Sequence, residues 1–177
     1  MNNIALSYIV STKNKLPFLK YALKRLIKNI QSDEEIIVID AGSTDGTVPF
    51  VEELKNDGLI DQFVSEVDKG EAHGYNKGLL LSKGVLIKVI SDDDFFNYKA
   101  IQECKQVMLS NNHIDVMIGN IDNTYIDDFD KIYSEDMVED NFKNYLSTGE
   151  TFSFTGLSLM IRKKSISFTG LFLTNII

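Results

Sequence analysis

Three consecutive carboxylates, Asp92, Asp93 and Asp94, follow an apolar run that ends at Ile90, with only Ser91 between them. Ionised carboxylates repel one another, so a fold that holds them together in a cleft usually balances them with a cation. Carboxylate oxygens are ligands that suit Mg²⁺ and Mn²⁺. The triplet therefore indicates a metal site, although a solvated acidic turn at the end of a strand would contain the same three residues.

A second residue that could do chemistry is Asp40, at the end of a short apolar strand. Its carboxylate could accept a hydrogen bond from a nucleobase N–H or from a ribose hydroxyl. Gly42 and Gly46 in the following loop allow the backbone to turn tightly and approach a ligand. Ser43 and Asp45 in that loop have a simpler interpretation, because such residues commonly cap a helix, here the helix that is predicted to follow.

Apolar strands that alternate with amphipathic helices must position these residues. We predict strands over residues 4–10, 35–40, 63–66, 86–91, 114–120 and 157–162. We predict helices over residues 16–30, 48–56, 72–81 and 98–109. This order is typical of an α/β domain with a doubly wound, mostly parallel sheet flanked by helices. In such sheets the ligand lies beyond the carboxyl ends of the strands, so the polar segments after three strands should converge there. The convergence favours a metal site over an acidic turn.

Composition limits the class of partner. The chain has 177 residues, 44% of them hydrophobic, which suits one domain with a sizeable core. Its net charge of -8 argues against nucleic acid as a partner, because binding a phosphate backbone needs clustered cations.

Cys104 is the single cysteine, so no intramolecular disulfide can form and a cytoplasmic location is expected. We find no signal peptide and no apolar stretch of about 18 residues that could span a membrane. The acidic stretch 122–140 is most simply a solvated excursion.

Several motifs together resemble family 2 glycosyltransferases, which are inverting, nucleotide-sugar-dependent enzymes of GT-A fold. Residues 37–47 resemble the "VDDGSTDGT" stretch of that family, and residues 84–94 resemble its "GEYIxxLxSDD" metal motif. Residues 65–70 with 76–78 resemble the elements between these two motifs, and residues 9–14 resemble the first strand and base-binding loop. The resemblance spans about residues 4 to 120, in the order that the family has.

The resemblance implies a nucleotide-diphosphate sugar as donor and a glycan or lipid-linked molecule as acceptor. Ser11 and Thr12 would line the nucleobase pocket, and Asp40 would bind the base or the ribose. His73 stands where relatives often carry an aspartate and would meet the sugar or phosphate, with an ordinary polar helix residue as the alternative. The enzyme would act in the cytoplasm, and peripheral association with the inner face of the cell membrane is compatible with this.

The acidic motif takes its roles from the same resemblance. Asp93 would be the main ligand of a Mg²⁺ or Mn²⁺ ion that bridges to the diphosphate. Asp92 would help to hold the ribose or the metal, and Asp94 would touch the sugar or the ion. Lys69 could add a positive charge near the diphosphate, although it could equally be a solvated lysine.

The resemblance also has departures. Ala41 stands where the family commonly has a second aspartate, and Ser91 replaces the first aspartate of a D-x-D pattern. Residues 1–120 would form the nucleotide-sugar-binding GT-A part, and residues 121–177 an incomplete acceptor-binding part of the same domain. The general base is unknown, and assigning Glu150 would be a guess, so we expect a C-terminal truncation. The alternatives are an inactive nucleotide-sugar-binding fragment and, less favoured for want of a glycine-rich loop, a nucleotidyltransferase.

Overall fold

The computed structural model describes residues 4–119, 137–150 and 156–174. Its sheet has six strands in the order β3-β2-β1-β4-β6-β5. The strands are β1 (Leu6–Thr12), β2 (Glu34–Asp40), β3 (Gln62–Ser65), β4 (Leu86–Ser91), β5 (Val116–Ile118) and β6 (Leu159–Arg162). The α-helices are α1 (Leu16–Asn29), α2 (Thr47–Asn56), α3 (Glu71–Leu81), α4 (Tyr98–Ser110), α5 (Met137–Thr148) and α6 (Ile166–Thr169). Two 3₁₀ turns flank β6, Gly156–Ser158 and Lys163–Ser165.

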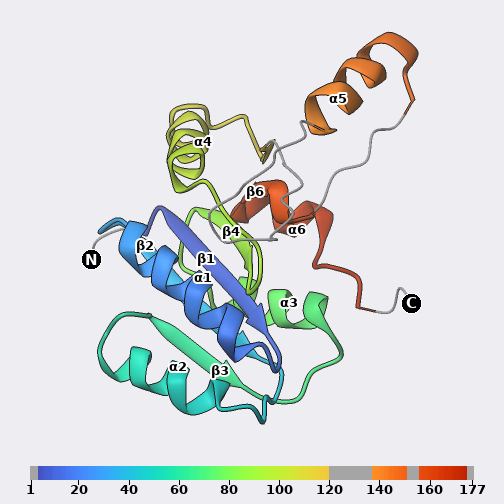
Figure 1. Ribbon diagram of the computed structural model, residues 1–177. Coiled ribbons are helices and arrows are strands. Elements are labelled where there is room, and N and C mark those ends of the chain that lie inside the picture. The colour runs from blue at the N-terminus through green and yellow to red at the C-terminus, as the bar shows by residue number, and fades with distance from the viewer. Residues whose placement is uncertain (1–3, 120–136, 151–155, 175–177) are drawn as a thin grey trace.

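The sheet is mostly parallel, and helices flank it as predicted (Figure 1). β1 pairs in parallel with β2 and β4, and β2 pairs in parallel with β3. β6 lies between β4 and β5 and is antiparallel to both. The predicted strand over 157–162 is therefore shorter but present, and it brings a late segment of the chain into the same sheet.

Alternate residues of β1 contact the helices on the two faces of the sheet. Tyr8 and Val10 belong to the core cluster that includes Leu23 of α1. Ile9 packs in a second cluster with Leu79 of α3. This alternation is the expected two-residue period of a strand, and burial on both faces explains why the middle of β1, Tyr8 to Val10, is uninterrupted in its apolar character.

The approach of α3 to β1 depends on two glycines. An added Cβ at Gly74 would lie 2.2 Å from the hydroxyl oxygen of Ser11, and one at Gly78 would lie 2.2 Å from a methyl carbon of Ile9. Only hydrogen fits at these positions, so α3 can pack directly on the end of β1 that leads to the candidate site.

One predicted boundary is wrong. Ser11 and Thr12 were expected in a loop beyond the first strand, but both are strand residues, because β1 is paired on both sides at Ser11 and still paired with β2 at Thr12. The loop is limited to residues 13–15. The fifth predicted strand, over 114–120, is found only at Val116–Ile118.

The apolar C-terminal segment is partly covered by α3. The backbone N–H of Phe172 donates to the side-chain oxygen of Asn76 at 2.9 Å, and the amide of Asn76 donates back to the Phe172 carbonyl at 2.8 Å. The Phe172 ring lies 6.1 Å from that of Tyr75. Leu173 nevertheless remains 72% exposed.

Most of the acidic stretch 122–140 lies outside the described residues. Its last residues belong to α5, a helix that the sequence did not predict and that projects from the body of the molecule (Figure 1). Within the described residues, the helices are too short or too polar to cross a lipid bilayer.

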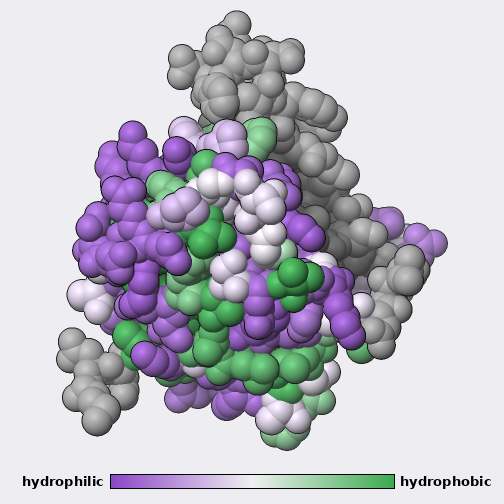
Figure 2. All heavy atoms as spheres, turned by 90° about the horizontal axis from the view of Figure 1, so that it is seen from below, coloured by the Kyte–Doolittle hydropathy of each residue, from purple (hydrophilic) through white to green (hydrophobic). Residues whose placement is uncertain are grey.

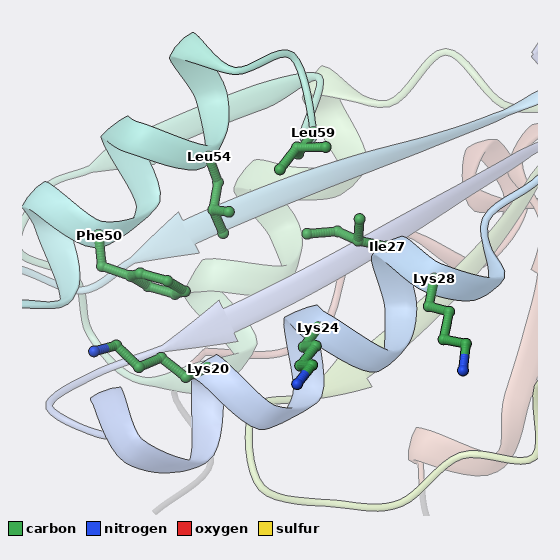
Figure 3. A pocket seen from close by; sticks show the side chains of 7 residues that line it. All are labelled: Lys20, Lys24, Ile27, Lys28, Phe50, Leu54 and Leu59. Atoms are coloured by element: carbon green, nitrogen blue, oxygen red, sulfur yellow. The ribbon is translucent and has the colours of Figure 1, made fainter.

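A groove of about 420 Å³ runs between α1 and α2. Its floor is apolar, and lysines of α1 border it (Figure 3); its lining is Lys20, Lys24, Ile27, Lys28, Phe50, Leu54 and Leu59. On the side of the molecule nearest α2, hydrophobic side chains lie among hydrophilic ones (Figure 2). None of the predicted site residues lines this groove, so it is separate from the site described next.

Candidate functional site

The carboxyl ends of β1, β2 and β4 bring the predicted polar segments to one edge of the sheet. Thr12 is paired with Asp40 across β1 and β2, and Ser11 is paired with Ser91 across β1 and β4. Asp40 and Ser91 are therefore two strand spacings apart, about 10 Å. The sequence correctly placed these segments together, and the intervening strand sets their separation.

Asp40 shapes the loop that follows it. Its side chain is fully buried, and its Oδ2 accepts hydrogen bonds from the backbone N–H groups of Gly42 (3.0 Å) and Ser43 (2.9 Å) and from the hydroxyl of Ser65 (2.7 Å). Its Oδ1 is buried without a hydrogen-bond partner among the described residues. A buried oxygen of this kind calls for an explanation, such as a bound ligand. Asp40 therefore fixes the loop through one oxygen and leaves the other as an acceptor.

Asp45 joins the start of two helices, which agrees with its interpretation as a capping residue. It accepts hydrogen bonds from the backbone N–H (3.1 Å) and hydroxyl (2.7 Å) of Thr47 in α2 and from the backbone N–H of Leu16 in α1 (2.9 Å). The bond from Leu16 and then those from Thr47 lower the pKa of Asp45. Ser43 instead accepts a hydrogen bond from the backbone of Asn14. These contacts hold the loops after β1 and β2 against each other.

Asp92 is the buried member of the triplet, with 5% of the residue exposed. Its Oδ2 accepts a hydrogen bond of 2.7 Å from the hydroxyl of Thr12, and its Oδ1 lies 3.4 Å from the ammonium group of Lys15. Burial raises its pKa, although Thr12 and Lys15 oppose this effect. The side chain is therefore fixed in place by β1 and by the loop beyond it.

Asp93 is more open, with 39% of its side chain exposed. Its carboxylate accepts hydrogen bonds from the Lys15 ammonium and from the Ser91 hydroxyl. Burial alone would raise its pKa, but the bonds from Lys15 and Ser91 outweigh it and hold the pKa of Asp93 below its usual value. Asp94 differs, because desolvation and the neighbouring Asp93 charge raise its pKa. The three carboxylates thus lie in three distinct environments.

The residues fit a divalent ion that is shared with a substrate. Within residues 4–119, 137–150 and 156–174, no three carboxylate, imidazole or thiol groups form a complete metal-binding set. Yet the Lys15 ammonium lies where Asp92 and Asp93 converge, so a cation already stands in that position. Mg²⁺ commonly uses one or two carboxylates and takes its remaining ligands from phosphate and water. Asp93 could supply such a ligand once Lys15 releases it.

Two further predicted residues lie on the α3 side of the edge. Ser11 is 7% exposed, and its hydroxyl lies beneath Gly74, so the strand and helix cover it. His73, in the first turn of α3, accepts a hydrogen bond at Nδ1 from the backbone N–H of Lys69 (3.1 Å). This bond leaves the ring proton on Nε2. Lys69 itself is exposed.

Lys15 and Asp68 also lie at this edge of the sheet, and neither is among the predicted site residues. For Lys15, the only signal in the sequence is its position one residue before a predicted helix. Asp68 lies in the segment before α3, and its buried Oδ2 has no hydrogen-bond partner in the described part of the chain. Asp40, which carries the other unpaired oxygen, is the last residue of β2, and Asp68 follows the end of β3.

Comparisons with known proteins agree with this arrangement. A family model described as "Glycosyl transferase family 2" matches residues 7–168. The glycosyltransferase GlyG of Streptococcus pneumoniae is 26% identical over 155 residues, which are 87% of this chain and 47% of GlyG. An uncharacterized glycosyltransferase of Nostoc sp. is 24% identical over 123 residues, which are 65% of this chain and 38% of that protein. The chain therefore spans less than half the length of these relatives.

Solved structures share the fold. The mannosyltransferase PcManGT from Pyrobaculum calidifontis, in complex with GDP-Man and Mn²⁺, matches with a TM-score of 0.71 and 18% identity, over 97% of this chain and 48% of that one. Staphylococcus aureus TarS 1–349, in complex with UDP-GlcNAc, matches with a TM-score of 0.66 and 18% identity, over 93% of this chain and 47% of that one. Because the family model covers nearly the whole chain and the sheet is that of GT-A enzymes, the protein belongs to glycosyl transferase family 2.

Proposed function

We propose that this chain binds a nucleotide-diphosphate sugar and, with a divalent metal, transfers the sugar with inversion to a glycan or lipid-linked acceptor. One observation carries the proposal. A buried, unpaired acceptor oxygen on Asp40 and a cation-binding carboxylate pair at Asp92 and Asp93 lie at the same sheet edge, two strands apart. A nucleoside diphosphate has hydrogen-bond donors at one end and negative charge at the other, which matches this order.

The nucleoside would bind at the ends of β1 and β2. Asp40 Oδ1 can accept a hydrogen bond from a base N–H or a ribose hydroxyl, and a ligand there would satisfy the one oxygen that the loop leaves unpaired. Thr12 and Ser11 would border this part of the site. Thr12 would act mainly by fixing Asp92, because its hydroxyl is already donated to that carboxylate.

The diphosphate would bind beside the acidic motif. Asp93 would hold Mg²⁺ or Mn²⁺ together with the phosphates, and the ion would supply Lewis-acid stabilisation of the charge that develops on the leaving nucleoside diphosphate. Asp92 would orient the ribose or the ion, and Asp94 would contact the sugar or the ion. His73 could donate its Nε2 proton to a sugar or phosphate oxygen.

The acceptor would bind on the side of the acidic motif that faces the C-terminal part of the chain. We propose that residues 121–177 contribute to acceptor binding, because β6 joins this part of the chain to β4 and so to the acidic motif. Inversion requires a general base that removes the proton from the attacking hydroxyl. Glu150 is exposed and lies in a loop after α5. In the described part of the chain no hydrogen bond or ion pair joins it to the triplet, so it is not assigned as that base.

Calorimetry with UDP-, GDP- and dTDP-sugars in the presence of MnCl₂ tests the proposal, paired with an assay for donor hydrolysis. We expect one donor class to bind, and Asp93→Asn to weaken its binding about tenfold or more, the scale of loss seen when metal sites are altered. Asp57→Asn, at an exposed acid after α2, is the matched control and should leave affinity unchanged. No binding by any donor would refute the proposal. Binding without hydrolysis would instead indicate a donor-binding chain that lacks catalysis.

A further inference from the structure

Lys15 is the cation that neutralises the acidic motif in the structure. Its ammonium group bonds to Asp93 and lies 3.4 Å from Asp92, and both carboxylates follow directly on the end of β4. The ammonium therefore lies between the two carboxylates, in the position that a metal ion would need.

The surroundings of Lys15 hold its backbone but not its side chain. Its carbonyl accepts the first hydrogen bond of α1, from the Leu19 N–H at 2.9 Å, and the next residue, Leu16, is tied to Asp45. Its side chain is 44% exposed. A lysine side chain has four rotatable bonds on a flexible stem, so the ammonium can move by several ångströms without any change in the fold.

A divalent ion and the Lys15 ammonium cannot share the same carboxylate oxygens, because like charges at contact distance repel strongly. A bound diphosphate changes this balance, since its oxygens offer Lys15 a new anionic partner. They also supply ligands that the two carboxylates alone cannot give to the metal.

We propose that Lys15 is an internal counter-ion that competes with the metal for Asp92 and Asp93 and transfers to the diphosphate when the donor binds. Metal alone then binds weakly, and metal and nucleotide bind cooperatively. The transfer to the diphosphate rests on the proposed function, whereas the competition with the metal follows from the ion pairs alone.

The test is Mn²⁺ binding, followed by electron paramagnetic resonance of the free ion, first with metal alone and then with UDP, GDP or dTDP present. In Lys15→Gln we expect affinity for Mn²⁺ alone to rise about tenfold, because a positive charge within about 4 Å of the ion has been removed. We expect the gain in Mn²⁺ affinity caused by the nucleotide to shrink by a similar factor. Lys15→Arg should behave like the wild type, and Lys99→Gln, at a lysine of α4 whose side chain is 87% exposed, should change neither quantity.

Unchanged or weaker binding of Mn²⁺ alone by Lys15→Gln would overturn the inference. Urea unfolding of each variant checks that the fold is intact. If Lys15→Gln fails to fold, Lys15→Arg tests the competition instead, because an arginine variant that bound Mn²⁺ more tightly than the wild type would contradict it. If no nucleotide binds the wild type while Lys15→Gln still tightens Mn²⁺ binding, the proposed function fails and the competition stands.

Discussion

Replacing Lys88 by methionine should change how the stability of the protein depends on pH. Lys88 lies within β4, and the residue is 5% exposed. Its ammonium group donates to the carbonyl oxygen of Leu157 and lies 5.1 Å from the centre of the Phe96 ring. Burial lowers the pKa of Lys88 from 10.5 to about 8, because these partners replace only part of the hydration that the ammonium loses.

The sign and size of the effect follow from this lowered pKa. Between about pH 8 and pH 10.5 the unfolded chain carries a proton on Lys88 that the folded chain has released, so the free energy of unfolding rises with pH. Below about pH 8 both states are protonated and the contribution of Lys88 is constant. The rise between pH 7 and pH 10 amounts to about 2.5 kcal/mol from this group alone.

Urea unfolding of the wild type and Lys88→Met at pH 7, 8, 9 and 10 measures this contribution. The difference in free energy of unfolding should shift by about 2.5 kcal/mol in favour of the wild type across that range. Lys99→Met controls for the loss of one positive charge, because the Lys99 side chain is 87% exposed. Parallel pH curves for the wild type and Lys88→Met would refute the assignment of a lowered pKa to Lys88.

Two further predictions concern the packing of α3 on the sheet and a buried ion pair. Gly78→Ala places a Cβ 2.2 Å from a methyl carbon of Ile9 and should lower the free energy of unfolding by about 1–3 kcal/mol. The control Gly156→Ala adds a Cβ that meets nothing within 4 Å, so its free energy of unfolding should be nearly that of the wild type. Equal effects of the two substitutions would contradict the close approach of α3 to β1. Lys105→Met leaves the fully buried Glu34 side chain without its 2.8 Å ion-pair partner and should cost about 3–5 kcal/mol in urea unfolding. Adding Glu34→Gln should recover part of that loss, and no recovery would count against the charge explanation.

The sequence was sufficient to predict the α/β architecture. The helical spacing of leucines in α1 and the apolar runs of β2 and β4 predicted elements whose ends differ from the structure by at most one residue. The end of β1 was harder, because Ser11 and Thr12 are polar and resemble loop residues. Their place in the strand is decided by pairing with β2 and β4, which a local pattern does not report.

The candidate site was predictable as a location and less so as a network. The order of strands placed Asp40 and the triplet at one edge, as the structure shows. The bond from Thr12 to Asp92 and the ion pair of Lys15 with Asp93 join residues 78 to 80 positions apart. Such contacts depend on side-chain directions in the folded protein, so no spacing rule reveals them.

Lys88 shows the same limit inside an apolar run. Its neighbours in β4 predict a buried strand, and burial of the lysine follows from that prediction. The carbonyl oxygens that accept its hydrogen bonds belong to Leu157, in the turn before β6, and to Leu159, the first residue of β6. Both follow Lys88 by about 70 residues, and a sequence pattern does not show that they are available. The cost of burying the charge therefore becomes visible only in the folded structure.

A crystal of this chain grown with MnCl₂ and the nucleoside diphosphate that binds best would test the central claim most directly, by the anomalous scattering of manganese. We expect a manganese peak bound to Asp93 and to the diphosphate, with the base or ribose against Asp40. A diphosphate at this edge with manganese bound elsewhere, or a nucleotide bound away from Asp40 and Asp93, would contradict it.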